Sequence, residues 1–157
     1  MKISIIILSL LFSTVDEPIT FSDLLFALEN DLNSVSDKFN SIGFIFLQTD
    51  SNEVGGDAVV WRYVADEKLN LLVAKFCLKP NCGGIQVQTD NEKLYFDLKK
   101  EAIALGFEYA DSNIDNSEKI DEVYSYYYKD NLKLQMSVGM YKNGKDNLYS
   151  ILLSTSE

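Results

Sequence analysis

The chain contains no histidine among its 157 residues. Histidine is the commonest general base and metal ligand, so its absence excludes the usual catalytic triads and imidazole metal sites. Phosphate-binding loops and dinucleotide fingerprints are also missing, because the glycine pairs at 55–56 and 83–84 stand alone in predicted turns. No pair of carboxylates stands out among the 24 Asp and Glu residues. We therefore expect a protein that is not an enzyme and needs no cofactor, with a carboxylate-based or calcium-dependent enzyme as the alternative.

Basic residues are few: 14 Lys and Arg face 24 Asp and Glu, which gives a net charge of −10. Nucleic-acid binding depends on basic side chains that neutralise phosphates, so a nucleic-acid partner is not expected. Attraction to anionic membrane surfaces is disfavoured for the same reason. Two interpretations of the acidity stay open. It serves solubility alone, or it forms an acidic face for a basic partner.

Cysteine occurs twice, as Cys77 and Cys82. The residues between and after them are Lys, Pro, Asn and Gly, which favour a tight turn between two strands. Two cysteines at the two sides of such a turn can reach disulfide distance, so this pair is the disulfide candidate. Two free thiols are the alternative. A redox or metal role is disfavoured because the spacing is not C-x-x-C.

Long apolar runs are absent except for residues 3–12, which follow the basic start Met1-Lys2. This run is shorter than the roughly 20 residues that span a bilayer. It is typical of a secretory signal, which we place at residues 1–15, although no Ala-x-Ala cleavage site follows. We expect a secreted or periplasmic protein that is not inserted in the membrane after processing. A buried first strand and an uncleaved anchor are the alternatives.

A repeated pattern runs through the rest of the chain. Gly43-Phe44 and Gly106-Phe107 each follow a helix-like segment, precede an aromatic residue two positions on, and lead to an Asp-Ser-Asn triplet. The two segments are 63 residues apart, and the same spacing aligns Trp61 with Tyr124. An internal period of this length indicates one structural unit used twice, at residues 20–90 and 91–157.

Helical periodicity predicts helices over 21–40, with a break near Asn33 and Ser34, and over 91–105. Period-two alternation and turn residues predict strands at 44–48, 58–64, 69–78, 85–89, 107–110, 123–129, 132–141 and 148–154. We therefore predict an α+β fold: two tandem helix-plus-four-strand repeats that form one compact domain and a largely antiparallel sheet, with the helices on one face. The alternation of Leu132 to Met140 puts these apolar residues on one face and Tyr141 on the other, so Tyr141 faces outward if the apolar residues face the helices.

This order of elements, with the repeated Gly-Phe-x-aromatic segment, resembles the β-lactamase-inhibitor-protein fold. In that fold, tandem helix-plus-four-strand units share a curved sheet. The resemblance covers residues 20–155. It implies an architecture and carries no inhibitor residue to this chain.

One segment matches most of a calcium-loop pattern. Asp111, Asn113, Asp115 and Glu122 stand at ligand spacing, with Asn116 in place of the usual glycine. The flanking segments are predicted strands, whereas a calcium-binding loop of this type lies between helices. We therefore expect a solvated polar loop over 111–122 and no specific metal site, with these residues as a weak calcium candidate.

Aromatic residues give the best indication of function. We predict a partner-binding aromatic face of the sheet, made of Trp61, Tyr63, Tyr124, Tyr126, Tyr128 and Tyr141. Which face of the sheet the tyrosines share stays open at this point. Trp and Tyr are common in binding surfaces, where they bury a large area and keep a polar group. Cross-strand packing in the core is the alternative for the same residues. The sequence thus favours an exported binding module for a protein or peptide, and the alternative is a structural or envelope-associated protein.

Overall fold

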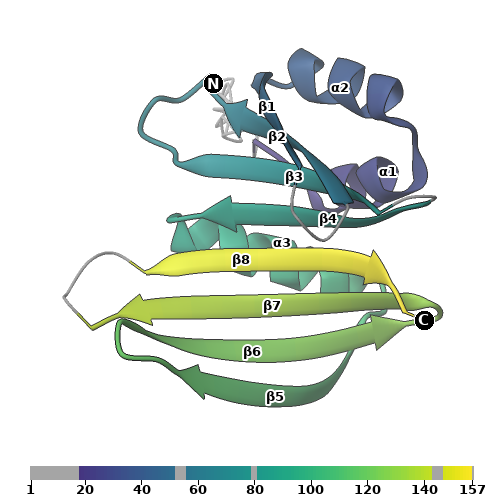
Figure 1. Ribbon diagram of the computed structural model, residues 1–157. Coiled ribbons are helices and arrows are strands. Elements are labelled where there is room, and N and C mark those ends of the chain that lie inside the picture. Colours follow the sequence, from purple (N-terminus) through teal and green to yellow (C-terminus); the bar gives the residue numbers. More distant parts are fainter. Residues whose placement is uncertain (1–17, 52–55, 79–80, 143–146, 157) are drawn as a thin grey trace, which may run out of the picture.

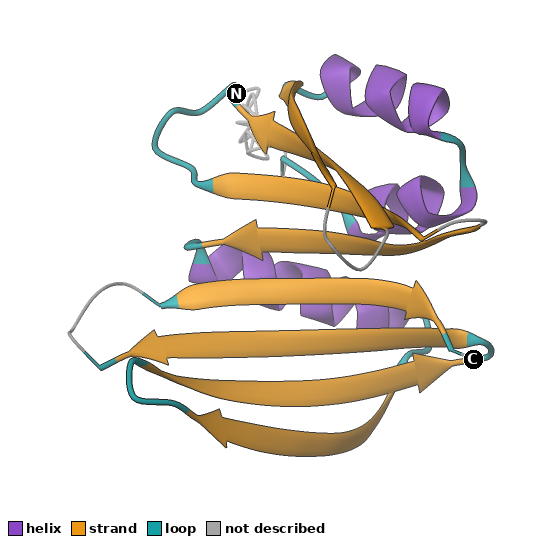
Figure 2. Cartoon of the chain, viewed as in Figure 1, coloured by secondary structure: helices purple, strands orange, loops and turns teal. Residues whose placement is uncertain are grey.

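Eight antiparallel strands form one open sheet, and three helices cover one of its faces (Figures 1 and 2). The computed structural model describes residues 18–51, 56–78, 81–142 and 147–156, without the side chains of 50, 51, 57, 77, 78, 81 and 82. In chain order the elements are α1 (Phe21–Glu29), α2 (Leu32–Ser41), β1 (Phe44–Ser51), β2 (Gly56–Tyr63), β3 (Leu71–Leu78), β4 (Asn81–Thr89), α3 (Glu92–Ala104), β5 (Glu108–Asn116), β6 (Ile120–Lys129), β7 (Leu132–Tyr141) and β8 (Leu148–Thr155). The sheet order is β1-β2-β3-β4-β8-β7-β6-β5, so β4 and β8 meet at the centre. The predicted α+β class with an antiparallel sheet is confirmed.

The first helical segment is two helices, as the sequence predicts, but the break lies earlier than Asn33 and Ser34. Asp31 is extended, and its carboxylate accepts hydrogen bonds from the backbone N–H groups of Asn33 (2.9 Å) and Ser34 (3.1 Å). This side chain therefore caps the new helix α2, whereas α1 ends at Glu29, where the backbone of Asn30 turns extended. Thr20 begins α1 in the same way and forms a reciprocal capping box with Asp23.

Both predicted glycine helix ends are confirmed. Gly43 follows α2 with φ +99°, and Gly106 follows α3 with φ +94°. L-residues with a side chain rarely adopt this conformation, so glycine ends these helices at low cost. At Gly43 an added Cβ would also lie only 2.9 Å from the Cβ of Ala65. The two glycines turn the chain directly into β1 and β5.

The predicted polar loop over 111–122 is wrong. β5 extends through Asp111 to Asn116, and β6 already begins at Ile120. Every residue of β5 is exposed, so this edge strand shows no alternation of apolar and polar residues. Its extended form comes from pairing with β6, which a local sequence pattern does not reveal.

Strand pairing places Trp61 and Tyr124 at different sites in β2 and β6. In both β1–β2 and β5–β6 the register shifts by one residue, at the positions of Leu47 and Ala110. Just before each shift, Phe46 pairs with Trp61 and Tyr109 pairs with Tyr127. Relative to the register shift, Tyr127 and not Tyr124 therefore stands where Trp61 stands, so the predicted alignment of Trp61 with Tyr124 does not agree with the strand register.

The core lies between the sheet and the helices. Trp61 is fully buried, with its ring centroid 5.2 Å from that of Phe39 on α2. Phe21 on α1 packs edge-on against Phe107, which precedes β5, at 5.3 Å. Tyr127 is buried on the same face. Aromatic side chains from both halves of the chain thus contribute to one core.

Helix α1 is held at both ends by side chains from distant elements. Its first residue, Phe21, donates its backbone N–H to the Glu101 carboxylate of α3 at 2.6 Å. At the other end, the buried Lys75 of β3 donates from Nζ to the carbonyls of Ala27 and Asn30, the latter at 2.7 Å. These contacts satisfy helix-end groups and place charges where the helix dipole favours them.

Two predictions concern residues outside those described. The signal segment 1–15 is one. The Cys77–Cys82 disulfide is the other. The backbone register pairs these two residues across the β3–β4 hairpin, and their side chains are not described. Among the described helices, none combines the length and the apolar character that a transmembrane span requires.

Candidate functional site

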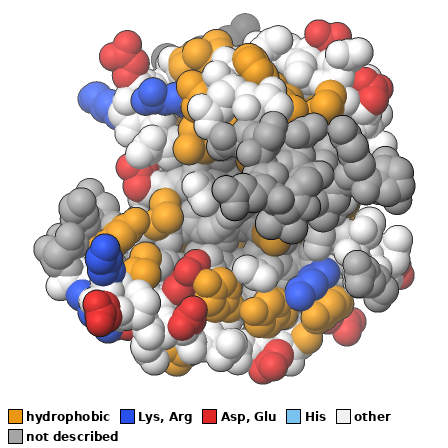
Figure 3. Space-filling model, in the orientation of Figure 1, with side chains coloured by type: hydrophobic (Ala, Val, Ile, Leu, Met, Phe, Trp, Pro, Cys, Tyr) orange, Lys and Arg blue, Asp and Glu red, His pale blue; other side chains and the backbone are white. Residues whose placement is uncertain are grey.

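The helix-free face of the sheet carries a row of tyrosines on β6. Because side chains alternate along a strand and Tyr127 points into the core, Tyr124, Tyr126 and Tyr128 share the opposite face. We call these three residues the tyrosine stripe. Tyr128 is 41% exposed, and the other two are partly buried. Figure 3 looks onto this face and shows hydrophobic side chains flanked by acidic and basic ones over the lower strands, β5 to β7.

Tyr141 also lies on the helix-free face, at the end of β7. The apolar positions of β7 point to the helices: Leu134 and Met136 are buried. Tyr141 is half-exposed, and it alternates with them on the other side. Four of the six predicted binding aromatics therefore share this face.

Trp61 and Tyr63 do not belong to this surface, so their assignment to a partner-binding face is wrong. Trp61 is 0% exposed, and Tyr63 packs on the core with its ring 5.2 Å from that of Phe44. Both side chains point to the helices. The physical reason is the pleat of β2, which turns alternate residues to one side, and the helices cover that side.

A hydrogen-bonded group fixes one end of the stripe. Tyr124 donates its hydroxyl to one oxygen of Glu122 at 2.7 Å, and Ser137 of β7 donates to the other oxygen at 2.8 Å. The bond to the carboxylate, with a smaller contribution from burial, raises the pKa of Tyr124 to about 12. A phenol held protonated in this way is poorly suited to act as a general base near neutral pH.

A lysine lies on the middle ring of the stripe. Lys133 of β7 places its Nζ 5.0 Å from the ring centroid of Tyr126. An ammonium group at this distance over an aromatic ring is attracted by the negative charge of the ring face. The stripe therefore already holds one cation from its own chain.

Carboxylates surround the stripe. The strand register places Glu108 beside Tyr128, Asp111 beside Tyr126 and Asp115 beside Glu122. Side chains that pair directly across an antiparallel ladder have Cβ atoms about 4.5–5.5 Å apart. On this face of β5, β6 and β7, four carboxylates thus accompany one ammonium group. The stripe lies in an electronegative field.

The calcium candidates belong to this surface, but they do not form a loop. Asp111, Asn113 and Asp115 alternate along the extended strand β5, so neighbouring members lie about 6.6–6.8 Å apart along the strand. A calcium loop instead wraps its ligands around one point. Among the described residues, no group of three or more acidic or cysteine side chains is placed to hold a metal ion.

An apolar hollow occupies the other half of the same face, and the sequence analysis did not find it. Its volume is about 270 Å³, and its lining is Leu47, Gln48, Ala58, Val60, Leu72, Ala74, Phe76, Gln86 and Gln88. At the centre of the sheet, Gln86 of β4 donates to the Ser150 hydroxyl of β8 at 2.9 Å, so this polar contact lies between the hollow and the stripe. The apolar residues at every second position on the solvent side of β2 and β3 are the signal that could have indicated it.

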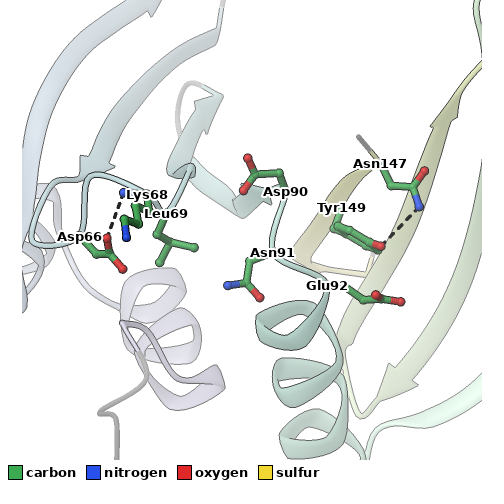
Figure 4. A pocket seen from close by; sticks show the side chains of 8 residues that line it. All are labelled: Asp66, Lys68, Leu69, Asp90, Asn91, Glu92, Asn147 and Tyr149. Carbon is green, nitrogen blue, oxygen red and sulfur yellow. Dashed lines mark hydrogen bonds between the residues drawn. The ribbon is translucent and has the colours of Figure 1, made fainter. Parts of the chain in front are cut away.

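A second hollow lies at the end of the molecule where β4 turns into α3 (Figure 4). It has a volume of about 510 Å³ and is lined mostly by polar residues, including Asp66, Asp90 and Glu92. Figure 4 shows that these three carboxylates point in different directions and do not converge on one position. Asn91 is already used there, because its side chain caps α3 by accepting from the N–H of Leu94 at 3.0 Å. This hollow offers no catalytic arrangement.

Comparison of the chain with protein-family models, curated proteins and solved structures found no match. The resemblance to the β-lactamase-inhibitor-protein fold therefore stays a prediction.

Proposed function

We propose that this protein is a non-enzymatic binding module that recognises a protein or peptide partner on the helix-free face of its sheet. The observation that carries the proposal is the tyrosine stripe, with Tyr141 on the same face. These aromatic side chains are partly or largely exposed on β6 and β7, whereas Trp61 and Tyr127 are buried on the other face of the sheet. Tyrosines at such positions bury a large area on binding and lose little conformational entropy.

The shape of the face supports the same proposal. The stripe stands on one half of the sheet and the apolar hollow lies in the other half. A partner that covers both halves can stack on the tyrosines with one segment and place an apolar side chain of another segment in the hollow. Interfaces commonly combine such an apolar pocket with a polar rim.

Selection of short random peptides displayed on phage tests this proposal. We expect wild-type protein to enrich peptides that lose at least about tenfold in affinity for the variant Tyr124→Ser/Tyr126→Ser/Tyr128→Ser, since hot-spot aromatics each contribute more than ~1 kcal/mol. The control is Tyr109→Ser on the neighbouring strand β5. This tyrosine is 59% exposed but points to the helix side.

Two results would contradict the proposed function. One is a selection that yields no peptide sensitive to the stripe. The other is equal loss of binding in the Tyr109 control. Circular dichroism of each variant establishes that the fold is retained.

We also propose that residues 20–90 and 91–157 are two copies of one structural unit. The support is the shared order of elements, the positive φ of Gly43 and Gly106, and the register shift at the same place in β1–β2 and β5–β6. A shared sheet would bury the strand edge that each unit leaves open at β4 or β8. An experimental structure in which Trp61 and Tyr127 do not superpose would refute this proposal.

Export is the third part of the proposal. The support is the basic start and the apolar run at residues 3–12. Ile19 is fully buried and Thr20 caps α1, so the mature chain must retain both. N-terminal sequencing of protein from the native host should therefore start after the apolar run and no later than Ile19. An intact Met1 on a cytosolic protein would contradict export.

A further inference from the structure

We infer that the tyrosine stripe recognises cationic side chains, so that the partner is an extended segment with Lys or Arg at alternate positions. The inference rests on the proposed function and names the chemistry of the partner. It starts from the one cation that the stripe already holds. Lys133 Nζ lies 5.0 Å from the ring centroid of Tyr126, so this surface binds an ammonium group within its own chain.

The rings on either side of Tyr126 have no such cation among the described contacts. Tyr124 is hydrogen-bonded to Glu122, and Tyr128 is 41% exposed. Their ring faces have the same chemistry as that of Tyr126, and they are the next residues along the same side of β6. Cations supplied by a partner could stack on both.

The surrounding carboxylates would complete each contact. The register places Glu108 beside Tyr128 and Asp115 beside Glu122. Glu122 is held from two sides, by Tyr124 and Ser137, and each of its oxygens keeps a further acceptor position. A guanidinium or ammonium group could thus lie on a ring and donate to a carboxylate that is already oriented.

Spacing selects an extended partner. The tyrosines recur at every second residue of a strand, about 6.6–6.8 Å apart. An extended segment presents the side chains of one side at the same interval. Cations at every second position of an extended segment therefore match the ring spacing along β6.

The probe is a fluorescein-labelled peptide of alternating Arg and Ser, and its twin carries citrulline in place of every Arg. Citrulline keeps the shape of arginine and removes its charge. In fluorescence anisotropy at physiological salt, we expect the Arg peptide to bind at least about tenfold more tightly than the citrulline peptide, as two or three ring–cation contacts would give.

Two variants separate this site from general attraction to an acidic protein. Lys133→Met frees the ring of Tyr126, so it should tighten the Arg peptide by about threefold or more. Glu122→Gln should weaken it by a similar factor. The matched control is Asp37→Asn on α2, which removes one exposed carboxylate far from the stripe and should leave the affinity unchanged.

The inference is overturned if the citrulline twin binds as tightly as the Arg peptide, if Lys133→Met weakens the Arg peptide, or if Asp37→Asn weakens it as much as Glu122→Gln does. These results leave the proposed binding face standing, provided that the phage selection still yields peptides sensitive to the stripe. Failure of that selection would instead remove the proposed function itself.

Discussion

Strands β2 and β6 occupy the same place in the two halves of the sheet, each second from an edge. The two strands are alike on the side that faces the helices and different on the side that faces solvent. Toward the helices both strands carry a buried aromatic residue, Trp61 or Tyr127. Toward solvent, β2 carries small residues such as Ala58 and Val60, whereas β6 carries the tyrosine stripe. Packing against the helices thus requires a similar buried side chain in both strands. The side without helices is free to form a hollow in one half and a raised aromatic row in the other.

The largest expected effect comes from the buried side of this comparison. Trp61→Ala removes the largest fully buried side chain and should lower the free energy of unfolding by about 3–5 kcal/mol. Tyr126→Ala on the solvent side should cost less than about 1 kcal/mol, because its ring is only partly covered. Urea denaturation measures both values. Equal losses of unfolding free energy at the two positions would mean that Tyr126 contributes to the core as Trp61 does, which would contradict an exposed tyrosine stripe.

Much of the fold could be predicted from sequence because it depends on local chemistry. Gly43 and Gly106 mark helix ends through a backbone conformation that few other residues adopt. Asp130 and Asn131 mark a hairpin turn, and Asp130 has φ +51°. The alternation in β7 correctly separates Leu134 and Met136 from Tyr141. Each of these signals lies within a few residues of the chain.

The candidate site could be predicted only in part, because it depends on pairing between distant strands. Tyr124, Tyr126 and Tyr128 share a face by alternation, but which face follows from the packing of Tyr127 under α3. Trp61 lies on the helix side, away from the tyrosine stripe, and its alignment with Tyr124 does not reveal this because the alignment contains no strand register. The apolar hollow comes from side chains of β1 to β4 that no local pattern brings together.

The buried lysine gives the next largest effect. Lys75 and Met136 occupy the same place relative to Trp61 and Tyr127 in the strand register, so Lys75→Met gives the first half the residue of the second. We expect a loss of about 1–3 kcal/mol in unfolding free energy, because the carbonyls of Ala27 and Asn30 lose their donor. Lys68→Met on an exposed loop is the control and should change stability by less than about 0.5 kcal/mol.

The same variant has a signature in its pH dependence. Burial lowers the pKa of Lys75 below its ordinary value of 10.5. The unfolded chain then binds more protons than the folded chain in the window just below 10.5, so wild-type stability rises with pH there. The stability advantage of wild type over Lys75→Met should therefore widen as the pH approaches that window in urea titrations. A constant difference would mean that the lysine titrates as it does in the unfolded chain.

The helix starts differ between the halves and give a smaller effect. Burial alone would raise the pKa of Asp23, but hydrogen bonds from Thr20 and Lys38 outweigh it, so the pKa is lowered. Helix α3 has the single cap Asn91. Asp23→Asn should cost about 1 kcal/mol at neutral pH, and this stabilising contribution should disappear as the pH falls below the ordinary 3.8 of the carboxyl. Asp97→Asn, in an exposed pair with Lys93, is the control and should change stability by less than about 0.5 kcal/mol.

The smallest expected effect on stability concerns the exposed edge at β5. The N–H groups of Ser112 and Ile114 donate to the side chains of the residues just before them, Asp111 at 2.7 Å and Asn113 at 2.8 Å. These bonds occupy backbone donors that a further strand would use, so they protect the edge from pairing with another copy.

Replacing Asp111 and Asn113 together by Thr should change the unfolding free energy by less than about 0.5 kcal/mol, because the strand is exposed. It should nevertheless promote association, which sedimentation velocity detects as a concentration-dependent dimer or larger species. The control is Asp115→Asn, which removes a charge from the same strand. It leaves the two side-chain bonds to the N–H groups of Ser112 and Ile114 in place. If that control associates equally, then charge repulsion rather than the covered N–H groups keeps the chains apart. If only the double variant associates, then the bonds from the N–H groups of Ser112 and Ile114 to Asp111 and Asn113 are what prevents a second copy from pairing with the β5 edge. These bonds leave the helix-free face of β5 and β6 accessible.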